Sequence, residues 1–135
     1  MVNDREKARL QKVNRLIQKN ISKTLHAEIK DPRLQFVDIL EVAVTNDFSL
    51  ARVYYTIFNS GSSSDVELAS KLKELESAFT KASGFIRSKI AKDLQFKKTP
   101  EIRFIYDLRY QNKEKVDDIL KNLSVKSEEN TNNND

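Results

Sequence analysis

The sequence predicts a single α+β domain. Two long segments carry apolar residues at spacings of three and four, which indicates amphipathic helices, and three shorter segments are rich in β-branched and aromatic residues, which indicates strands. A helix with one apolar stripe must bury it, and one face of a sheet is the natural surface to receive it. A chain of 135 residues is long enough for one such core.

The first expected element is a helix from about Asp4 to Lys30. Pro32 ends it, because the residue before a proline avoids helical geometry. The apolar positions of this helix recur on one face and are Leu10, Val13, Ile17, Ile21 and Leu25.

Two strands are expected next, over residues 36 to 45 and 51 to 58. The connection between them contains Asn46, Asp47 and Ser49, which readily turn a chain by bonding their own backbone. The two segments therefore predict an antiparallel hairpin.

A loop is expected over residues 59 to 63, and a helix is expected to start at a capping box made by Ser64 and Glu67. Its apolar stripe continues to Gly84 and resumes beyond it, so the sequence favours helix on both sides of the glycine. A third strand is expected over residues 101 to 107, after Pro100. The apolar positions of the two helical parts are Leu68, Leu72, Leu75, Phe79, Ile86, Ile90 and Leu94.

The end of the chain predicts a short helix and a tail. The helix would carry Val116, Ile119, Leu120 and Leu123 on one face. Residues 124 to 135 are polar and rich in asparagine, and we expect them to be disordered because they have little apolar surface to bury. The predicted domain therefore spans residues 1 to 123.

Gly84 is unusual because glycine within a helix costs about 1 kcal/mol relative to alanine. One interpretation is that Ala82 and Gly84 are small so that the helix packs closely on the sheet. The other is that the helix kinks or breaks there and exposes backbone amides that can bind phosphate oxygens.

Positive charge is concentrated around this glycine. Residues 81 to 98 hold six cations against Asp93 alone, which gives a local balance of +5 in a chain whose net charge is +4. The cations are Lys81, Arg87, Lys89, Lys92, Lys97 and Lys98. Such a cluster suits a polyanion, although an ordinary solvated helix face is the alternative.

The first helix carries a second set of cations, within an arc of about 120 degrees nearly opposite its apolar stripe. Surface helices usually alternate acidic residues with lysines, which then form ion pairs one turn apart. This helix has few acidic residues to form such pairs. The sequence therefore predicts contact with nucleic acid, with an acidic protein or an anionic membrane surface as lesser alternatives. The six cations are Arg5, Arg9, Lys12, Arg15, Lys19 and Lys23.

Several kinds of chemistry are not supported. The chain has no cysteine and a single histidine, His26, which we expect to be solvated. Zinc sites, Cys/His nucleophilic sites and phosphate-binding glycine loops are thus not expected, nor is any cofactor. No apolar run is long enough to span a membrane. We expect a cytoplasmic, non-catalytic protein that is a monomer. Tyr54, Phe58 and Phe85 could stack on bases, but packing is the commoner role.

Four segments of the chain form a distinctive series. They are IKDPR (29 to 33), VTNDFSLARVYYTIF (44 to 58), ASGFIRSKIAKDL (82 to 94) and TPEIRFIYD (99 to 107). In this order they resemble the ribosome-binding factor A family of bacterial assembly factors for the small ribosomal subunit. The resemblance implies a KH-like fold of type II order, α-β-β-α-α-β, in which an Ala-x-Gly helix kink replaces the GxxG loop. Ala82, Ser83 and Gly84 match that kink.

The resemblance also implies a function. Members of the family bind the immature small (30S) subunit, assist late maturation of the 5′ end of its 16S ribosomal RNA, and matter most in the cold. With no GxxG loop in this chain, we expect recognition of folded RNA by shape and phosphate contacts, and we include Ser83 and Gly84 with the two sets of cations as candidate RNA-binding residues.

Overall fold

The structure is a computed structural model that describes residues 3–58 and 64–108. The elements are α1 (Asp4–Lys23), a π-helical turn (Thr24–Glu28), a 3₁₀ turn (Pro32–Leu34), β1 (Val37–Val44), β2 (Leu50–Ile57), α2 (Asp65–Leu94) and β3 (Glu101–Tyr106). The predicted loop at 59 to 63, final helix and polar tail lie outside the described residues.

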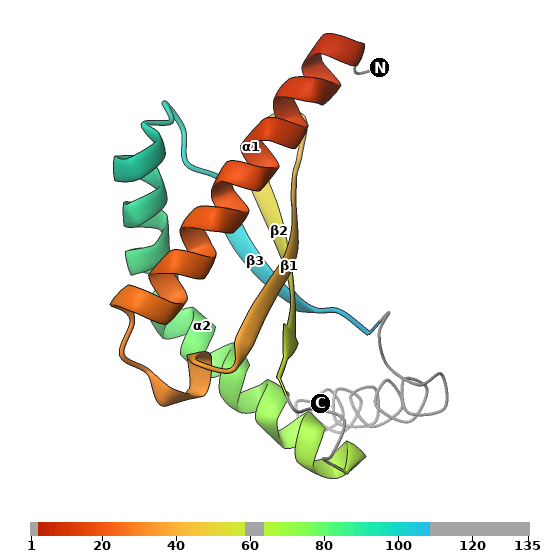
Figure 1. The fold of residues 1–135 in the computed structure, drawn as a ribbon, viewed down its shortest axis with the longest axis vertical. Helices are drawn as coiled ribbons and strands as arrows, with labels where there is room; N and C mark the ends of the chain where they lie inside the picture. Colours follow the sequence, from red (N-terminus) through yellow and green to blue (C-terminus); the bar gives the residue numbers. More distant parts are fainter. Residues whose placement is uncertain (1–2, 59–63, 109–135) are drawn as a thin grey trace, which may run out of the picture.

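The α+β prediction is confirmed. The three strands form one sheet in the order β1-β2-β3, in which β1 and β2 are antiparallel and β2 and β3 are parallel (Figure 1). The predicted hairpin is therefore present, and the connection from β2 to β3 runs through α2.

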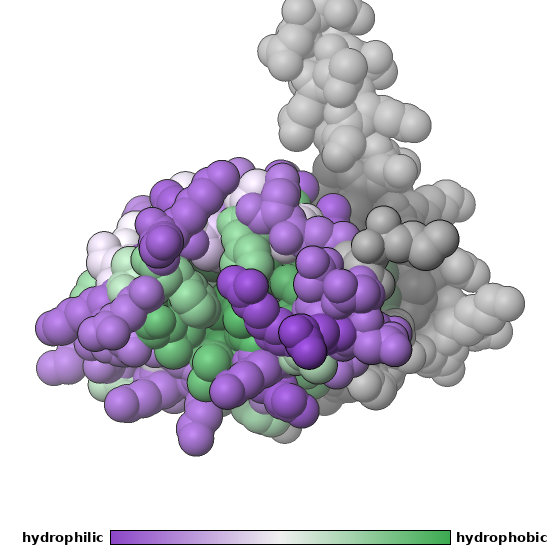
Figure 2. Space-filling view, turned by 90° about the horizontal axis from the view of Figure 1, so that it is seen from above, coloured by the Kyte–Doolittle hydropathy of each residue, from purple (hydrophilic) through white to green (hydrophobic). Residues whose placement is uncertain are grey.

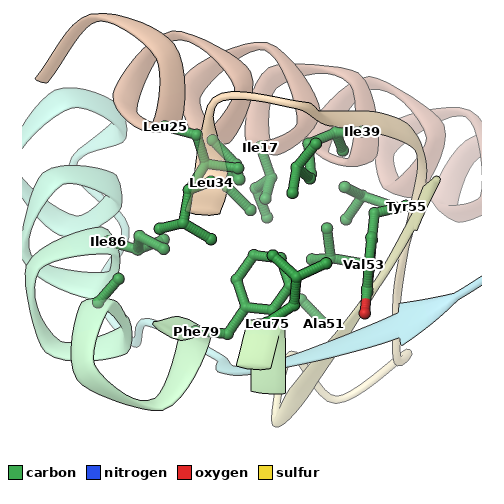
Figure 3. Packing of buried hydrophobic residues seen from close by; sticks show 14 of the residues in the cluster. Ile17, Leu25, Leu34, Ile39, Ala51, Val53, Tyr55, Leu75, Phe79 and Ile86 are labelled. Carbon is green, nitrogen blue, oxygen red and sulfur yellow. The ribbon is translucent and has the colours of Figure 1, made fainter. Parts of the chain in front are cut away.

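The core lies between the sheet and the two helices. Ile17 from α1, Val53 from β2 and Ile86 from α2 are fully buried and point into the same interior (Figure 3). Burying an aliphatic side chain of this size contributes roughly 1.5–3 kcal/mol, so the shared interior is the main source of stability.

Polar caps begin both helices. The side chain of Asn3 accepts a hydrogen bond from the Glu6 N–H at 2.8 Å, and the side chain of Ser64 accepts one from the Glu67 N–H at 3.2 Å, as the predicted helix start requires. The helix α2 ends at Gln95, which has a left-handed φ of 53° where glycine is more usual.

The sequence predicts two helices between β2 and β3, and the structure has one. Because α2 continues through Gly84, the amides there lie inside the helix, so the prediction of exposed free amides at a helix break was wrong. Figure 1 nevertheless shows α2 changing direction where its colour passes from green to teal.

Side chains of the N-terminal helical region cover the outer edge of β1. Gln18 donates to the carbonyls of Ile39 and Leu40 at 3.2 and 3.1 Å, and Asn14 accepts from the Val44 N–H at 2.9 Å. The ring of His26 is exposed as expected, but its Nε2 lies 2.7 Å from the Val37 carbonyl and must donate to it. These bonds satisfy main-chain groups that the hairpin leaves unpaired.

The turn of the hairpin is organised by one carboxylate. Asp47 Oδ1 accepts hydrogen bonds from the Thr45 hydroxyl at 2.8 Å and from the Ser49 hydroxyl and N–H at 2.7 and 3.1 Å. The bond from the Ser49 side chain makes the largest contribution, and together these bonds lower the pKa of Asp47 to about 2. Phe48, next to it, has a φ of 59°.

This lowered pKa predicts a pH-dependent stability. The ionised carboxylate stabilises the fold above the ordinary pKa of about 3.8, and the stabilisation is lost as the pH falls toward 2 and the group takes up a proton. We expect Asp47→Ala to unfold at lower urea concentration than the unchanged protein at neutral pH, with the difference shrinking between pH ~4 and ~2. An equal difference at all these pH values would contradict the assignment.

Candidate nucleic-acid interface

The six predicted cations of α1 all lie on its exposed side, away from the buried Val13, Ile17 and Ile21. We call this set the α1 basic face. Within residues 3–58 and 64–108 no ion pair neutralises any of its members. The guanidinium of Arg9 lies 5.7 Å from the ring centre of Phe48, so Arg9 also helps to hold the hairpin against α1. The six are Arg5, Arg9, Lys12, Arg15, Lys19 and Lys23.

The second half of α2 lies beside α1 (Figure 1). Asn20 of α1 donates to the carboxylate of Asp93 at 3.0 Å, and the ammonium of Lys89 pairs with Glu28 at 3.1 Å. These contacts bring one end of the second cation cluster to α1. Lys89 itself is half-buried, and its charge is neutralised by Glu28. This ion pair is part of the fold, so Lys89 is not open to a phosphate.

The other cations of the second cluster are exposed but do not share one surface. Lys81 lies beside Asp31 in the turn before β1, and Arg87 donates to the Thr99 carbonyl at 3.2 Å on the way to β3. The structure thus joins Lys89 to the neighbourhood of α1, whereas Lys81 and Arg87 extend to different sides of α2. Lys92 is exposed and precedes Asp93 in the chain. Lys97 and Lys98 are exposed in the connection between α2 and β3.

Figure 2 shows the molecule from the end at which α1 begins. Seen from there, hydrophilic side chains surround an apolar centre (Figure 2). Half-buried Phe48, Leu94 and Phe96 pack against the core from the segments around this end. Hydrophilic side chains therefore surround apolar surface here rather than covering it.

Gly84 is exposed, and a Cβ built on it would meet nothing within 4 Å. Close packing on the sheet therefore does not require this glycine, and that interpretation was wrong for Gly84. Ala82 is buried and lines a pocket with Ile29 and Asp31 of the segment before β1, while Ser83 is half-buried. No contact inside the described structure explains why position 84 lacks a side chain.

Aromatic side chains are more exposed than the sequence suggested. Phe58 and Phe85 are 52% and 48% exposed, so the expectation that they pack was wrong, while Tyr54 is half-buried. Phe36, which sequence analysis missed, is 56% exposed and lies across from Phe58, whose N–H donates to the Phe36 carbonyl at 2.9 Å. Phe36 is the first residue of the predicted strand over residues 36 to 45, and the pattern of that strand gave no sign that its side chain is exposed.

The turn before β1 contains a short ion pair. Arg33 donates to both carboxylate oxygens of Asp31 at 3.1 and 2.8 Å, and this side-chain bonding lowers the pKa of Asp31. Together with Phe36 and Phe58, Arg33 lines a groove of about 400 Å³ whose lining includes charged residues of both signs, Lys71 and Glu74 among them. This groove has a different electrostatic character from the α1 basic face.

Two further observations concern residues 3–58 and 64–108 only. They contain no group of three or more histidine, cysteine, aspartate or glutamate side chains placed to hold a metal ion. None of the helices in that part of the chain has the length and apolar character that crossing a bilayer demands.

Comparison with known proteins identifies one family. A family model described as ribosome-binding factor A matches residues 9–120. The ribosome-binding factor A of Alcanivorax borkumensis is 40% identical over 68% of this chain and 62% of its own length, and that of Magnetococcus marinus is 38% identical over 87% and 89%.

Solved structures agree on the fold. The crystal structure of Thermus thermophilus ribosome-binding factor A has a TM-score of 0.57 at 18% identity, over 72% of this chain and 94% of that one. A homology model of the same Thermus protein, fitted into a cryo-EM map of its complex with the 30S subunit, has a TM-score of 0.55 at 16% identity and covers 73% and 94%. At these identities the similarity concerns the fold.

The open space at Gly84 predicts a gain in stability on substitution. We expect Gly84→Ala to raise the free energy of unfolding by about 1 kcal/mol, because alanine is the better helix former and its methyl group meets no neighbour. Urea denaturation measures this change. A less stable variant would show that α2 needs glycine for its own geometry, and Ala82→Gly, at a buried position, is the control expected to lose stability.

Proposed function

Because the chain belongs to the ribosome-binding factor A family, we propose that it is a non-catalytic assembly factor that binds the immature small ribosomal subunit. Support for this partner comes from the Thermus relative, which was fitted into a map of its complex with the 30S subunit. The proposal includes assistance in late maturation of the 5′ end of the 16S ribosomal RNA, a role in the cold, and a cytoplasmic site of action.

The observation that carries the proposal is the α1 basic face. Six cations of one sign repel one another unless an anion lies against them, and within the described residues no carboxylate pairs with any of them. Ribosomal RNA presents regularly spaced phosphates, and neutralising each one releases counterions, which supplies affinity without reading sequence.

The second half of α2 extends this surface. Lys92 precedes Asp93, which accepts a hydrogen bond from Asn20 of α1, and Lys97 and Lys98 follow in the connection to β3. In this proposal an RNA bound along α1 reaches these further cations. Lys81 and Arg87 contact RNA on either side of α2 in this proposal, while Lys89 orients the helix through Glu28.

In this proposal α2 bends at Ala82, Ser83 and Gly84, and RNA approaches the helix most closely there. The fold is KH-like in this proposal, and the bend takes the position of the GxxG loop that other KH domains use to hold the nucleic-acid backbone. The absence of a side chain at Gly84, in open space, supports close approach by a partner outside the chain.

Charge reversal on the α1 basic face tests the proposal. We expect the triple variant Lys12→Glu, Arg15→Glu, Lys19→Glu to bind small-subunit precursors about 100-fold more weakly while remaining folded, because these side chains are exposed. Arg9 is left unchanged because it contacts Phe48. The slope of log affinity against log salt should fall by about 3, one unit for each lost phosphate contact.

The matched control is the triple variant Lys30→Glu, Arg52→Glu, Lys73→Glu, which makes the same change in net charge at exposed positions outside the α1 basic face. It should keep most of the affinity. Equal loss in both variants would mean that net charge, not this face, drives binding. Binding that survives ribonuclease treatment of the precursor would favour an acidic protein as the partner.

A bulky side chain at position 84 tests close approach. Gly84→Leu should keep or raise stability, because its Cβ meets nothing within 4 Å, but should weaken precursor binding by about tenfold if RNA lies against the helix there. Ser70→Leu, at an exposed position in the first half of α2, is the control. Unchanged binding by Gly84→Leu would remove Ala82, Ser83 and Gly84 from the interface.

A further inference from the structure

The two edges of the sheet differ in how their main-chain groups are satisfied. On β1, side chains of Asn14, Gln18 and His26 bond outward-facing N–H and C=O groups at four points. A strand edge covered in this way cannot pair with another chain.

Among the described residues, the outer edge of β3 has no such cover at Ile102 and Phe104. Glu101 donates its N–H to the Ser49 carbonyl at 3.0 Å and Asp107 donates to the Tyr55 carbonyl at 2.8 Å, which sets the alternation of the parallel ladder. Ile102 and Phe104 therefore direct their N–H and C=O groups away from β2. Across residues 3–58 and 64–108 nothing bonds these groups.

A groove of about 420 Å³ follows this edge, between β3 and the first half of α2. Ile102 and Phe104 line it from the core side of β3 and Arg103 lines it from the opposite side, so the groove runs along the edge of the strand rather than over one face. On the α2 side it is lined by Leu72, Lys73, Glu76, Phe79, Thr80 and Ser83.

The aromatic rings at this groove already contact one another. The rings of Phe79 and Phe104 are stacked, with centres 3.9 Å apart and planes 6° apart. Tyr55 meets Phe79 edge-on at 5.0 Å, and both side chains are seen in Figure 3. Unpaired bases bind on open aromatic faces, which this cluster does not offer. What the edge offers is the pattern of main-chain donors and acceptors that another peptide strand complements.

We propose that the outer edge of β3 binds an extended segment of a partner protein by strand addition. Apolar side chains at alternate positions of the added strand pack over Leu72 and Phe79. Lys73 and Arg103 outnumber Glu76 at the groove, so the segment carries an acidic residue among the apolar ones. This site is separate from the α1 basic face, and the protein binds RNA and peptide on different surfaces.

The probe is a synthetic peptide of about seven residues, blocked at both ends, that alternates valine with threonine and contains one glutamate. Nuclear magnetic resonance of the whole chain follows the amide signals of Ile102 and Phe104. The expected result is a chemical-shift change and slower hydrogen exchange at these two amides. The same peptide methylated on alternate backbone nitrogens, which cannot form the ladder, should leave them unchanged.

A variant of the protein gives a second measurement. Ile102→Pro removes one outward N–H and leaves the bonds of Glu101 and Arg103 to β2 in place, so it should fold and bind the peptide about tenfold more weakly. It should still bind small-subunit precursors. The triple variant of the α1 basic face should do the reverse, so failure of either proposal is seen separately.

Four results would overturn the inference. They are no effect of the peptide on Ile102 and Phe104, equal effects of the methylated and unmethylated peptides, changes at these amides with a short oligouridine instead of the peptide, and a dimer of the chain through β3 in the absence of peptide. If Ile102→Pro does not fold, the methylated peptide still decides the question with the unchanged protein.

Discussion

Burial of one apolar stripe of α1 determines where the charge of the molecule lies. Ile17 and Ile21 are fully buried, and a helix of 3.6 residues per turn must then turn its opposite side to water. Lys12, Arg15 and Lys19 occupy that side. The same packing that stabilises the fold therefore gathers cations on one exposed face. This face forms a surface for an anionic partner without any additional structural element.

Periodic patterns were the part of the fold that the sequence could predict. The stripe of α1, the hairpin and the Ser64 cap all depend on residues close together in the chain. The continuity of α2 depends on more distant packing: a glycine costs only about 1 kcal/mol, and burial of Ala82, Ile86 and Ile90 in the core outweighs it. Local sequence alone therefore favoured a break that the packed helix does not have.

The candidate site was predictable to a similar extent. Helical spacing places the α1 basic face correctly, because one helix carries all of it. The sequence could not show which cations of the second cluster are open to solvent and which bond inside the protein. The partners of Lys89 and Arg87 come from other segments of the chain. Exposure of Phe36 and Phe58 was missed for the same reason, as burial at a strand end depends on what the neighbouring segments leave uncovered.

The bonds from Asn14 and Gln18 to β1 have a mechanical consequence. They pin the helix to the strand at two successive turns, so α1 can neither roll about its axis nor slide along the sheet without breaking them. The cations of α1 are then held at fixed positions, about one turn of helix, or about 5.4 Å, apart along its axis. Such a rigid array of charges favours a target whose own charges already lie at matching intervals. A target that must first be rearranged binds more weakly, because it loses conformational entropy on binding.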